Sequence, residues 1–225
     1  MTPLPLLMLL SALSARAQTT EPSAASRPDG PRNVAILLYE GVELLDFAGP
    51  GEIFAAARTA QDAPAFNVYT VAESRSPILS EGFLTIIPQY SLARCPRPDI
   101  LVLPGGNANV PLGSSTVMEW VRRTAPQCEI AMSVCNGAHL LAQAGQLNSL
   151  RVTTHHGAMA RLRTFVPSAT VIENVRFVDN GRIVTTAGVS AGIDGALHVV
   201  DRLVGRAAAT QTARYMEYEW RPDRP

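Results

Sequence analysis

One cysteine in this chain stands where a nucleophile would be expected, at a sharp corner between an apolar run and a helix. Cys135 follows Ser133 and Val134, and Gly137 and Ala138 come shortly after it. Small residues on both sides are what a tight strand-to-helix corner requires. A helix start presents free backbone N–H groups and a positive dipole end, which favour a thiolate. We therefore expect Cys135 to be a nucleophile, the alternative being a thiol packed in the core.

An acid that could serve this cysteine lies in the segment LLDFAGP, residues 44–50. Asp46 is set there among apolar residues near the start of a predicted helix. A carboxyl group in an apolar pocket has a raised pKa and can hold a proton for general acid catalysis. The alternative reading is a helix cap or an acid that compensates the dipole in the first turn.

Backbone N–H groups near the same corner are expected to orient the reacting group. A second apolar run stops at Gly105 and Gly106, and Asn136 directly follows the cysteine. The N–H groups of these three residues could together form an oxyanion hole.

Histidines could supply a further proton partner. His155 and His156 follow two threonines, and His155 could approach the cysteine, the alternative being an ordinary satisfied polar residue. His139 and His198 have apolar neighbours and are expected to pack. No His-x₃-His or Cys-x-x-Cys spacing occurs, so the sequence predicts no metal site, and it indicates no cofactor.

Apolar runs and helical patterns alternate along the chain, and together they must position these groups. Strands are expected at 33–39, 66–71, 99–103 and 129–134, with an antiparallel pair at 78–87 and a hairpin at 175–184 that turns at Asn180-Gly181. Helices are expected within 41–60, with Pro50 near the helix start, and at 116–125, 137–144, 158–165, 191–203 with Ser190 as cap, and 207–219. This alternation predicts an α/β fold with a mostly parallel sheet, helices on both faces and ligands beyond the carboxyl ends of the strands.

The composition is that of a globular domain. The chain has 225 residues, of which 47% are hydrophobic and 17% charged, and its formal net charge is zero. No basic patch favours nucleic acid, and no charge run favours a membrane surface. Three cysteines are present, and Cys95 and Cys128 could form a bridge or remain two separate thiols.

The N-terminus differs from the rest of the chain. A short apolar run, Leu4–Leu13, is followed by Ala15-Arg16-Ala17, which is the pattern of a secretory signal peptide with its cleavage site. The alternative is an over-extended start or a loose tail. We expect a signal peptide at 1–17, a flexible mature N-terminus at 18–31, one domain at 32–219 and a tail at 220–225, with the protein exported to the periplasm or secreted.

Six segments, taken in order, carry a family resemblance. They are AILLY at 35–39, LDFAGP at 45–50, LPGG at 103–106, SVCNGA at 133–138, TTH at 153–155 and TAGVSAGID at 186–194. This set resembles the ThiJ/PfpI superfamily of class I glutamine-amidotransferase-like proteins, to which the parkinsonism-associated deglycases are similar. Within it, the chain looks most like the isonitrile hydratases and the sensor domains of AraC-type regulators.

The resemblance implies a flavodoxin-like three-layer sandwich, usually dimeric, with a nucleophile elbow. It implies that Cys135 is the elbow nucleophile, that Asp46 matches the acid of a Leu-Asp-x-x-Gly-Pro motif, and that His155 lies near the cysteine. The chain departs from the family at Asn136, where the peptidase-like members have His and the hydratases have Thr. That departure argues against peptidase chemistry and leaves hydration open.

The sequence therefore predicts a cysteine-dependent lyase that hydrates a small organic isonitrile to an N-substituted formamide. Two alternatives remain: an exported, non-catalytic cysteine sensor of oxidants or electrophiles, and a glyoxalase or deglycase acting on reactive carbonyls. The expected partners are a small-molecule substrate and a second copy of the chain, with neither nucleic acid nor stable membrane insertion.

Overall fold

The computed structural model describes residues 30–222. The expected signal peptide, nearly all of the expected flexible N-terminus and the last residues of the tail lie outside the described residues. Within residues 30–222, no helix is long and apolar enough to cross a membrane.

A seven-stranded sheet forms the centre of the fold, in the order β10-β11-β7-β6-β1-β2-β5. All neighbours in this sheet pair in parallel except β10 and β11, which form the antiparallel hairpin. β3 pairs with β4, and β8 with β9, in two small separate sheets. The strands are β1 (Arg32–Leu37), β2 (Phe66–Ala72), β3 (Ile78–Ser80), β4 (Leu84–Ile86), β5 (Tyr90–Ser91), β6 (Ile100–Leu103), β7 (Ile130–Ser133), β8 (Arg151–Val152), β9 (Thr170–Val171), β10 (Phe177–Asp179) and β11 (Ile183–Thr186).

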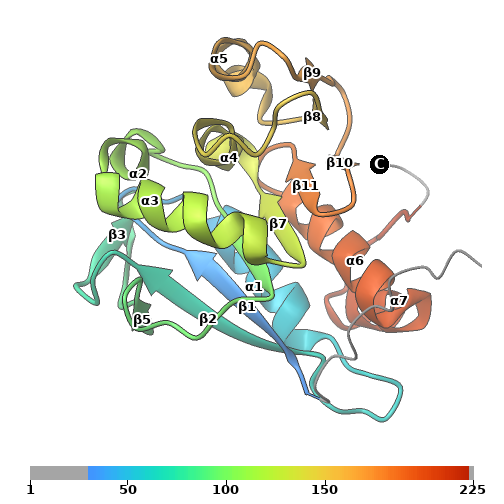
Figure 1. The fold of residues 1–225 in the computed structure, drawn as a ribbon. Coiled ribbons are helices and arrows are strands. Elements are labelled where there is room, and N and C mark those ends of the chain that lie inside the picture. The colour runs from blue at the N-terminus through green and yellow to red at the C-terminus, as the bar shows by residue number, and fades with distance from the viewer. Residues whose placement is uncertain (1–29, 223–225) are drawn as a thin grey trace, which may run out of the picture.

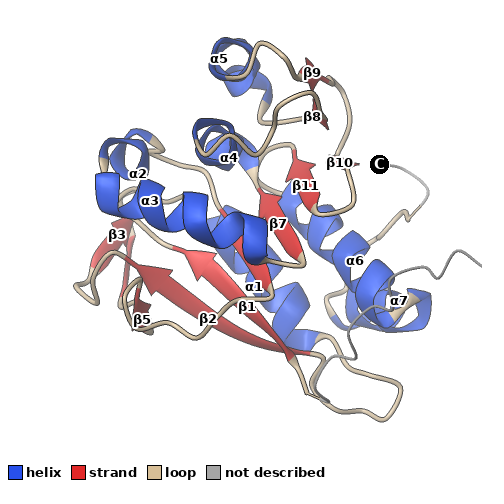
Figure 2. Cartoon of the chain, viewed as in Figure 1, coloured by secondary structure: helices blue, strands red, loops and turns tan. Residues whose placement is uncertain are grey.

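Helices cover both faces of the sheet, as Figures 1 and 2 show. α1, α6 and α7 pack against one another on one face, and α2, α3 and α4 pack together on the other, with α5 against α4. The helices are α1 (Leu44–Ala56), α2 (Asn109–Gly113), α3 (Ser115–Thr124), α4 (Ala138–Gln143), α5 (Met159–Phe165), α6 (Ala191–Val204) and α7 (Arg206–Tyr215). The α/β sandwich with a mostly parallel sheet is thus confirmed.

The central strands are buried throughout and mostly apolar because both of their faces are covered. Every residue of β6, β7 and β11 is buried, and so are the last four residues of β1. A strand buried on both faces lacks the polar alternation of a half-exposed strand. Continuous apolar runs in the sequence therefore predict the positions of β1, β6 and β7.

Two local expectations about helix ends are wrong. Pro50 lies inside α1 instead of near its start, where it cannot donate the usual hydrogen bond to the Asp46 carbonyl. The proline ring is buried and packs against Gly192 of α6, which offsets the missing bond. Ser190 precedes α6 but does not cap it, because its hydroxyl accepts a hydrogen bond from Arg176 at 3.1 Å.

Candidate active site

Cys135 occupies a strained corner at the carboxyl end of β7. Its backbone has φ of +56°, a left-handed conformation that residues other than glycine rarely adopt. The corner is held by the Cys135 N–H, which donates to the Ala187 carbonyl at 2.9 Å, and by the Thr154 hydroxyl, which donates to the Cys135 carbonyl at 2.7 Å. A Cβ at Gly137 would collide with the Leu103 carbonyl, so the corner requires glycine there. The predicted elbow is thus present in the backbone.

Asp46 lies against the cysteine and is completely buried. One carboxylate oxygen accepts the Gly105 N–H at 2.8 Å, and the other accepts the Val189 N–H at 3.1 Å. Cys135 lies beside this carboxyl group, since an ideal Cβ on Gly105 would be 2.7 Å from both the Asp46 oxygen and the Cys135 Cβ, and each group shifts the pKa of the other. The reading of Asp46 as a helix cap is wrong, because its backbone partners belong to the loops after β6 and β11 and not to its own helix.

The pKa values of Asp46 and Cys135 are both raised above their ordinary values. Burial, with a contribution from the Glu43 charge, raises the pKa of Asp46 to about 7. The hydrogen bonds from the Gly105 and Val189 N–H groups act in the opposite direction and lower it. Burial and then the Asp46 charge raise the pKa of Cys135 to about 12. Both causes oppose ionisation of Cys135, so they do not support the thiolate expected at a helix start, which stays a prediction. The helix that follows, α4, has only six residues and begins after a 3₁₀ turn, so burial outweighs its dipole.

The expected oxyanion hole at the Gly105-Gly106 turn is not open. The Gly105 N–H donates to Asp46, and the Gly106 N–H donates to the Asn136 side-chain oxygen at 3.1 Å. The Asn136 backbone N–H lowers the pKa of Cys135, against burial and the Asp46 charge, which raise it. The sequence correctly placed these three residues beside the cysteine, but the chain itself already uses the two glycine N–H groups.

His155 directly follows Thr154, whose hydroxyl bonds the Cys135 carbonyl, but His155 itself is not hydrogen-bonded to the cysteine. Its Nδ1 accepts the Gly157 N–H at 3.2 Å, and its ring lies 4.0 Å from that of His156. Burial and then His156 lower the pKa of His155. Among residues 30–222, no hydrogen bond links His155 to Cys135, so its role as a proton partner stays a prediction.

The other two histidines lie in packing positions. His139 is buried, with Nε2 3.2 Å from the Ala158 carbonyl oxygen and its ring edge-on to Phe165. His198 lies on α6 with its ring against Phe177 and its Nε2 2.7 Å from the Asp179 carboxylate. Packing was the expected role of both residues.

Sequence analysis missed two contributors to the site. Tyr39, at the end of the first apolar run, is buried and donates its hydroxyl to the Pro104 carbonyl at 2.8 Å. Burial and then the charges of Asp46 and Cys135 raise its pKa. Val189, with φ of +53°, supplies the second N–H to Asp46. Both follow strands at their carboxyl ends, and that position was the available signal.

The remaining cysteines do not form the conceivable bridge. Cys95, Cys128 and Cys135 are all free thiols. Within the described part of the chain, no group of three or more histidine, cysteine or acidic side chains could hold a metal ion.

Comparison with known proteins identifies the family. The DJ-1/PfpI family model matches residues 32–202. The chain is 31% identical over 186 residues to the isonitrile hydratase of Pseudomonas putida, covering 82% of this chain and 78% of that one.

Solved structures agree with this match. A ThiJ/PfpI family protein from Pseudomonas syringae has a TM-score of 0.75 and 26% identity over 89% of this chain and 85% of its own. An AraC family transcriptional regulator from Pseudomonas putida shares the fold with a TM-score of 0.72 and 21% identity, over 83% of this chain and all of that one. The chain belongs to the DJ-1/PfpI family, which is the ThiJ/PfpI family that its sequence motifs indicate.

Proposed function

We propose that the protein hydrates a small organic isonitrile to an N-substituted formamide, with Cys135 as nucleophile and Asp46 as the group that transfers the proton. The observation that carries this proposal is the close approach of buried Cys135 to a buried carboxyl group whose pKa is about 7. An acid with that pKa both accepts and returns a proton near neutral pH. The similarity to an isonitrile hydratase supports the same chemistry.

In the first half of the reaction, the thiol adds across the terminal carbon of the isonitrile. The Cys135 proton passes to the Asp46 carboxylate as the sulfur attacks, and Asp46 delivers it to the same carbon. The C–S and C–H bonds form while the S–H bond breaks, giving a thioimidate, R–N=CH–S–Cys135. The thiol supplies the proton, so no other reactant is needed.

In the second half, water releases the product. The Asp46 carboxylate accepts a proton from water as the water oxygen attacks the thioimidate carbon, and it returns that proton to the nitrogen, which gives R–NH–CH(OH)–S–Cys135. The C–S bond then breaks as the hydroxyl proton passes through Asp46 to the sulfur, which yields R–NH–CHO and restores the Cys135 thiol. The two N–H donors on Asp46 keep the carboxylate oriented through both halves.

Two features favour hydration over the alternatives. Addition to a carbonyl develops charge on oxygen and benefits from free N–H donors, whereas the Gly105 and Gly106 N–H groups are engaged within the chain. Peroxide sensing depends on a thiolate, whereas burial and Asp46 hold the pKa of Cys135 at about 12. Isonitrile addition requires neither an oxyanion hole nor a preformed thiolate.

The test is a side-by-side assay of the purified mature protein with a model alkyl isonitrile, methylglyoxal and hydrogen peroxide. We expect formamide to form catalytically, with slower consumption of methylglyoxal and no stoichiometric oxidation of Cys135 by mild peroxide. Absence of formamide together with rapid loss of methylglyoxal would overturn the proposal in favour of a glyoxalase. Rapid oxidation of Cys135 without either turnover would favour the sensor.

We also propose export and a homodimer. The apolar run at 4–13 with Ala15-Arg16-Ala17 supports export, which N-terminal sequencing of the secreted or periplasmic protein would check. Exposed apolar side chains support the dimer, since Phe83 is 71% and Ile87 63% exposed at and after the β3–β4 hairpin. Sedimentation of the wild type and of Phe83→Asp should show a dimer and a monomer respectively.

A further inference from the structure

The side-chain amide of Asn136, beside the nucleophile, is engaged at both its oxygen and its nitrogen by contacts within the chain. Its side-chain oxygen accepts the Gly106 N–H at 3.1 Å, and its side-chain nitrogen donates to the Gly106 carbonyl at 2.9 Å. The amide group therefore pairs with the backbone of a single residue through both of its polar ends. A side chain held in this way has little freedom to turn toward a substrate.

The turn that Asn136 holds is also fixed from its other side. The Gly105 carbonyl accepts the Glu43 N–H at 2.9 Å, and the Asn107 N–H donates to the Gly41 carbonyl at 2.8 Å. Val42 and Gly106 form an isolated antiparallel bridge. A Cβ at Gly106, whose φ is +116°, would collide with the Gly41 carbonyl. The turn therefore cannot rotate to present its N–H groups elsewhere.

The side-chain oxygen of Asn136 lies beside the reactive pair. An ideal Cβ placed on Gly105 would lie 2.6 Å from the Asn136 oxygen, 2.7 Å from the Asp46 carboxylate oxygen and 2.7 Å from the Cys135 Cβ. These three groups thus crowd the same side of Gly105. The Asn136 oxygen accepts the Gly106 N–H, so this backbone donor beside the reactive pair is not free for a substrate oxygen.

We propose that Asn136 determines the class of electrophile that Cys135 accepts, because its side-chain oxygen occupies the Gly106 N–H and so disfavours additions that develop charge on oxygen. Aldehydes and other carbonyl compounds belong to that disfavoured class. Isonitriles do not, since the proton is delivered to carbon and no oxyanion forms. The isonitrile half of this inference rests on the proposed function, whereas the carbonyl half does not.

The carbonyl reaction that provides the test is simple and balanced. The Cys135 thiol adds to an aldehyde, forming a C–S bond while the thiol proton moves to the carbonyl oxygen, and the product is a hemithioacetal, R–CH(OH)–S–Cys135. The reaction is reversible and needs no further reactant. Its dissociation constant can be measured from the protection of Cys135 against alkylation by iodoacetamide at increasing methylglyoxal concentration.

The experiment compares the wild type with Asn136→Ala, Asn136→Ser, Asn136→Asp and a matched control, Asn107→Ala, which removes an exposed amide from the same turn. Loss of the amide should free the Gly106 N–H, so that Asn136→Ala binds methylglyoxal about tenfold more tightly than the wild type, as expected for one gained hydrogen bond to the oxygen of the hemithioacetal. Asn136→Asp keeps an oxygen at that N–H and should not gain affinity. Asn107→Ala should match the wild type.

The outcomes separate cleanly. Tighter aldehyde binding in Asn136→Ala but not in Asn136→Asp or Asn107→Ala supports the inference, even if no isonitrile is turned over and the proposed function fails. Equal affinity in the wild type and in a folded Asn136→Ala overturns it, as does an equal gain in Asn107→Ala. Asn136→Ser, whose hydroxyl is too short to span both contacts, decides the question by the same criteria if Asn136→Ala does not fold.

Discussion

The two ends of strand β7 each carry a buried cysteine, and the two cysteines differ in what receives their thiol proton. Burial is the largest cause of a pKa of about 12 at both Cys128 and Cys135, with a nearby aspartate, Asp99 or Asp46, as the second. The Cys128 thiol hydrogen-bonds to the carbonyls of Pro98 and Thr124, at 3.6 and 3.3 Å. The Cys135 thiol lies beside the Asp46 carboxyl group, whose charge raises its pKa. A carbonyl cannot carry the proton onward, but a carboxylate can.

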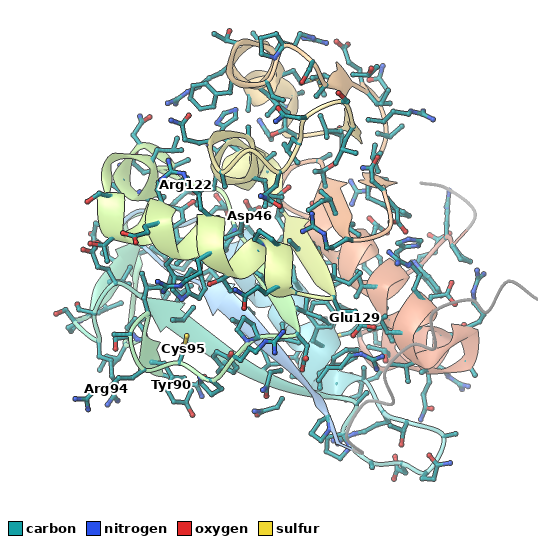
Figure 3. All side chains as sticks on the ribbon, viewed as in Figure 1. Asp46, Tyr90, Arg94, Cys95, Arg122 and Glu129 are labelled. Carbon is teal, nitrogen blue, oxygen red and sulfur yellow. The ribbon has the colours of Figure 1, made fainter. Side chains whose placement is uncertain are left out.

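The position in the sheet explains this difference. At the carboxyl ends of parallel strands, loops from separate βα units converge, and those after β1, β6 and β11 bring Asp46, Gly105 and Val189 to Cys135. At the amino end, Cys128 meets only the chain that enters β6 and the end of α3. Figure 3 shows Asp46 in the middle of the molecule, while Cys95 lies beside Tyr90 near the edge strand β5. The convergent loops, and not the thiol pKa, distinguish Cys135, the proposed nucleophile, from Cys128.

The largest expected contrast comes from removing each thiol in turn. Cys135→Ala should reduce isonitrile turnover by about 10⁴-fold or more, because the covalent route is lost. Cys128→Ala removes a thiol of the same pKa and should leave turnover within about twofold. Steady-state assays of both variants, with melting temperatures to control for folding, provide the measurement. Equal losses of turnover in the two variants would contradict the proposed difference between Cys135 and Cys128.

The next contrast separates the two effects of the Asp46 charge. Asp46→Asn should lower turnover about 10²- to 10⁴-fold because the proton carrier is lost. The same change should accelerate iodoacetamide alkylation of Cys135 about tenfold at pH 7.5, because the charge that raises its pKa is removed. Alkylation of Cys128 should not change. Slower alkylation of Cys135 in the folded variant would contradict the assigned thiol–carboxyl interaction.

A smaller effect is expected when the loop between the two groups is displaced. Gly105→Ala places a methyl group within 2.7 Å of Asn136, Asp46 and Cys135, so these side chains must move apart. We expect roughly a 100-fold loss of turnover, as for a displacement of about 1 Å in a catalytic group. Gly113→Ala is the matched control, because nothing lies within 4 Å of its added Cβ. Similar kinetics for the two variants would show that the packing around Gly105 does not matter.

The smallest expected effect is on stability. The folded-state pKa of Asp46, about 7, lies above its ordinary value of 3.8, so the folded protein binds this proton more tightly. The resulting stabilisation is full below about pH 3.8 and is lost as the pH rises through 7. Between pH 5 and 8, the wild type should therefore lose about 2–3 kcal/mol of unfolding free energy relative to Asp46→Asn. Urea unfolding at both pH values measures this, and parallel changes would refute the raised pKa.

The sequence predicts the frame of the site better than its chemistry. The sequence predicts the buried strands because runs such as residues 100–103 have no polar alternation. It predicts the corner at Cys135 because small residues surround that cysteine. The sequence does not show that the Gly105 and Gly106 N–H groups are already hydrogen-bonded, because their acceptors are side chains 59 and 30 residues away in the chain. The thiol state of Cys135 also escapes the sequence, because burial opposes a helix-start effect that local pattern alone suggests.

The most direct test of the central claim is to identify the covalent intermediate. The protein is mixed with a model alkyl isonitrile, quenched with acid within the first turnover, digested and analysed by mass spectrometry. The peptide that carries Cys135 should gain the whole mass of the isonitrile, and the peptides that carry Cys95 and Cys128 should gain nothing. Formamide production without any adduct on Cys135, or with equal adducts on Cys128, would contradict the account.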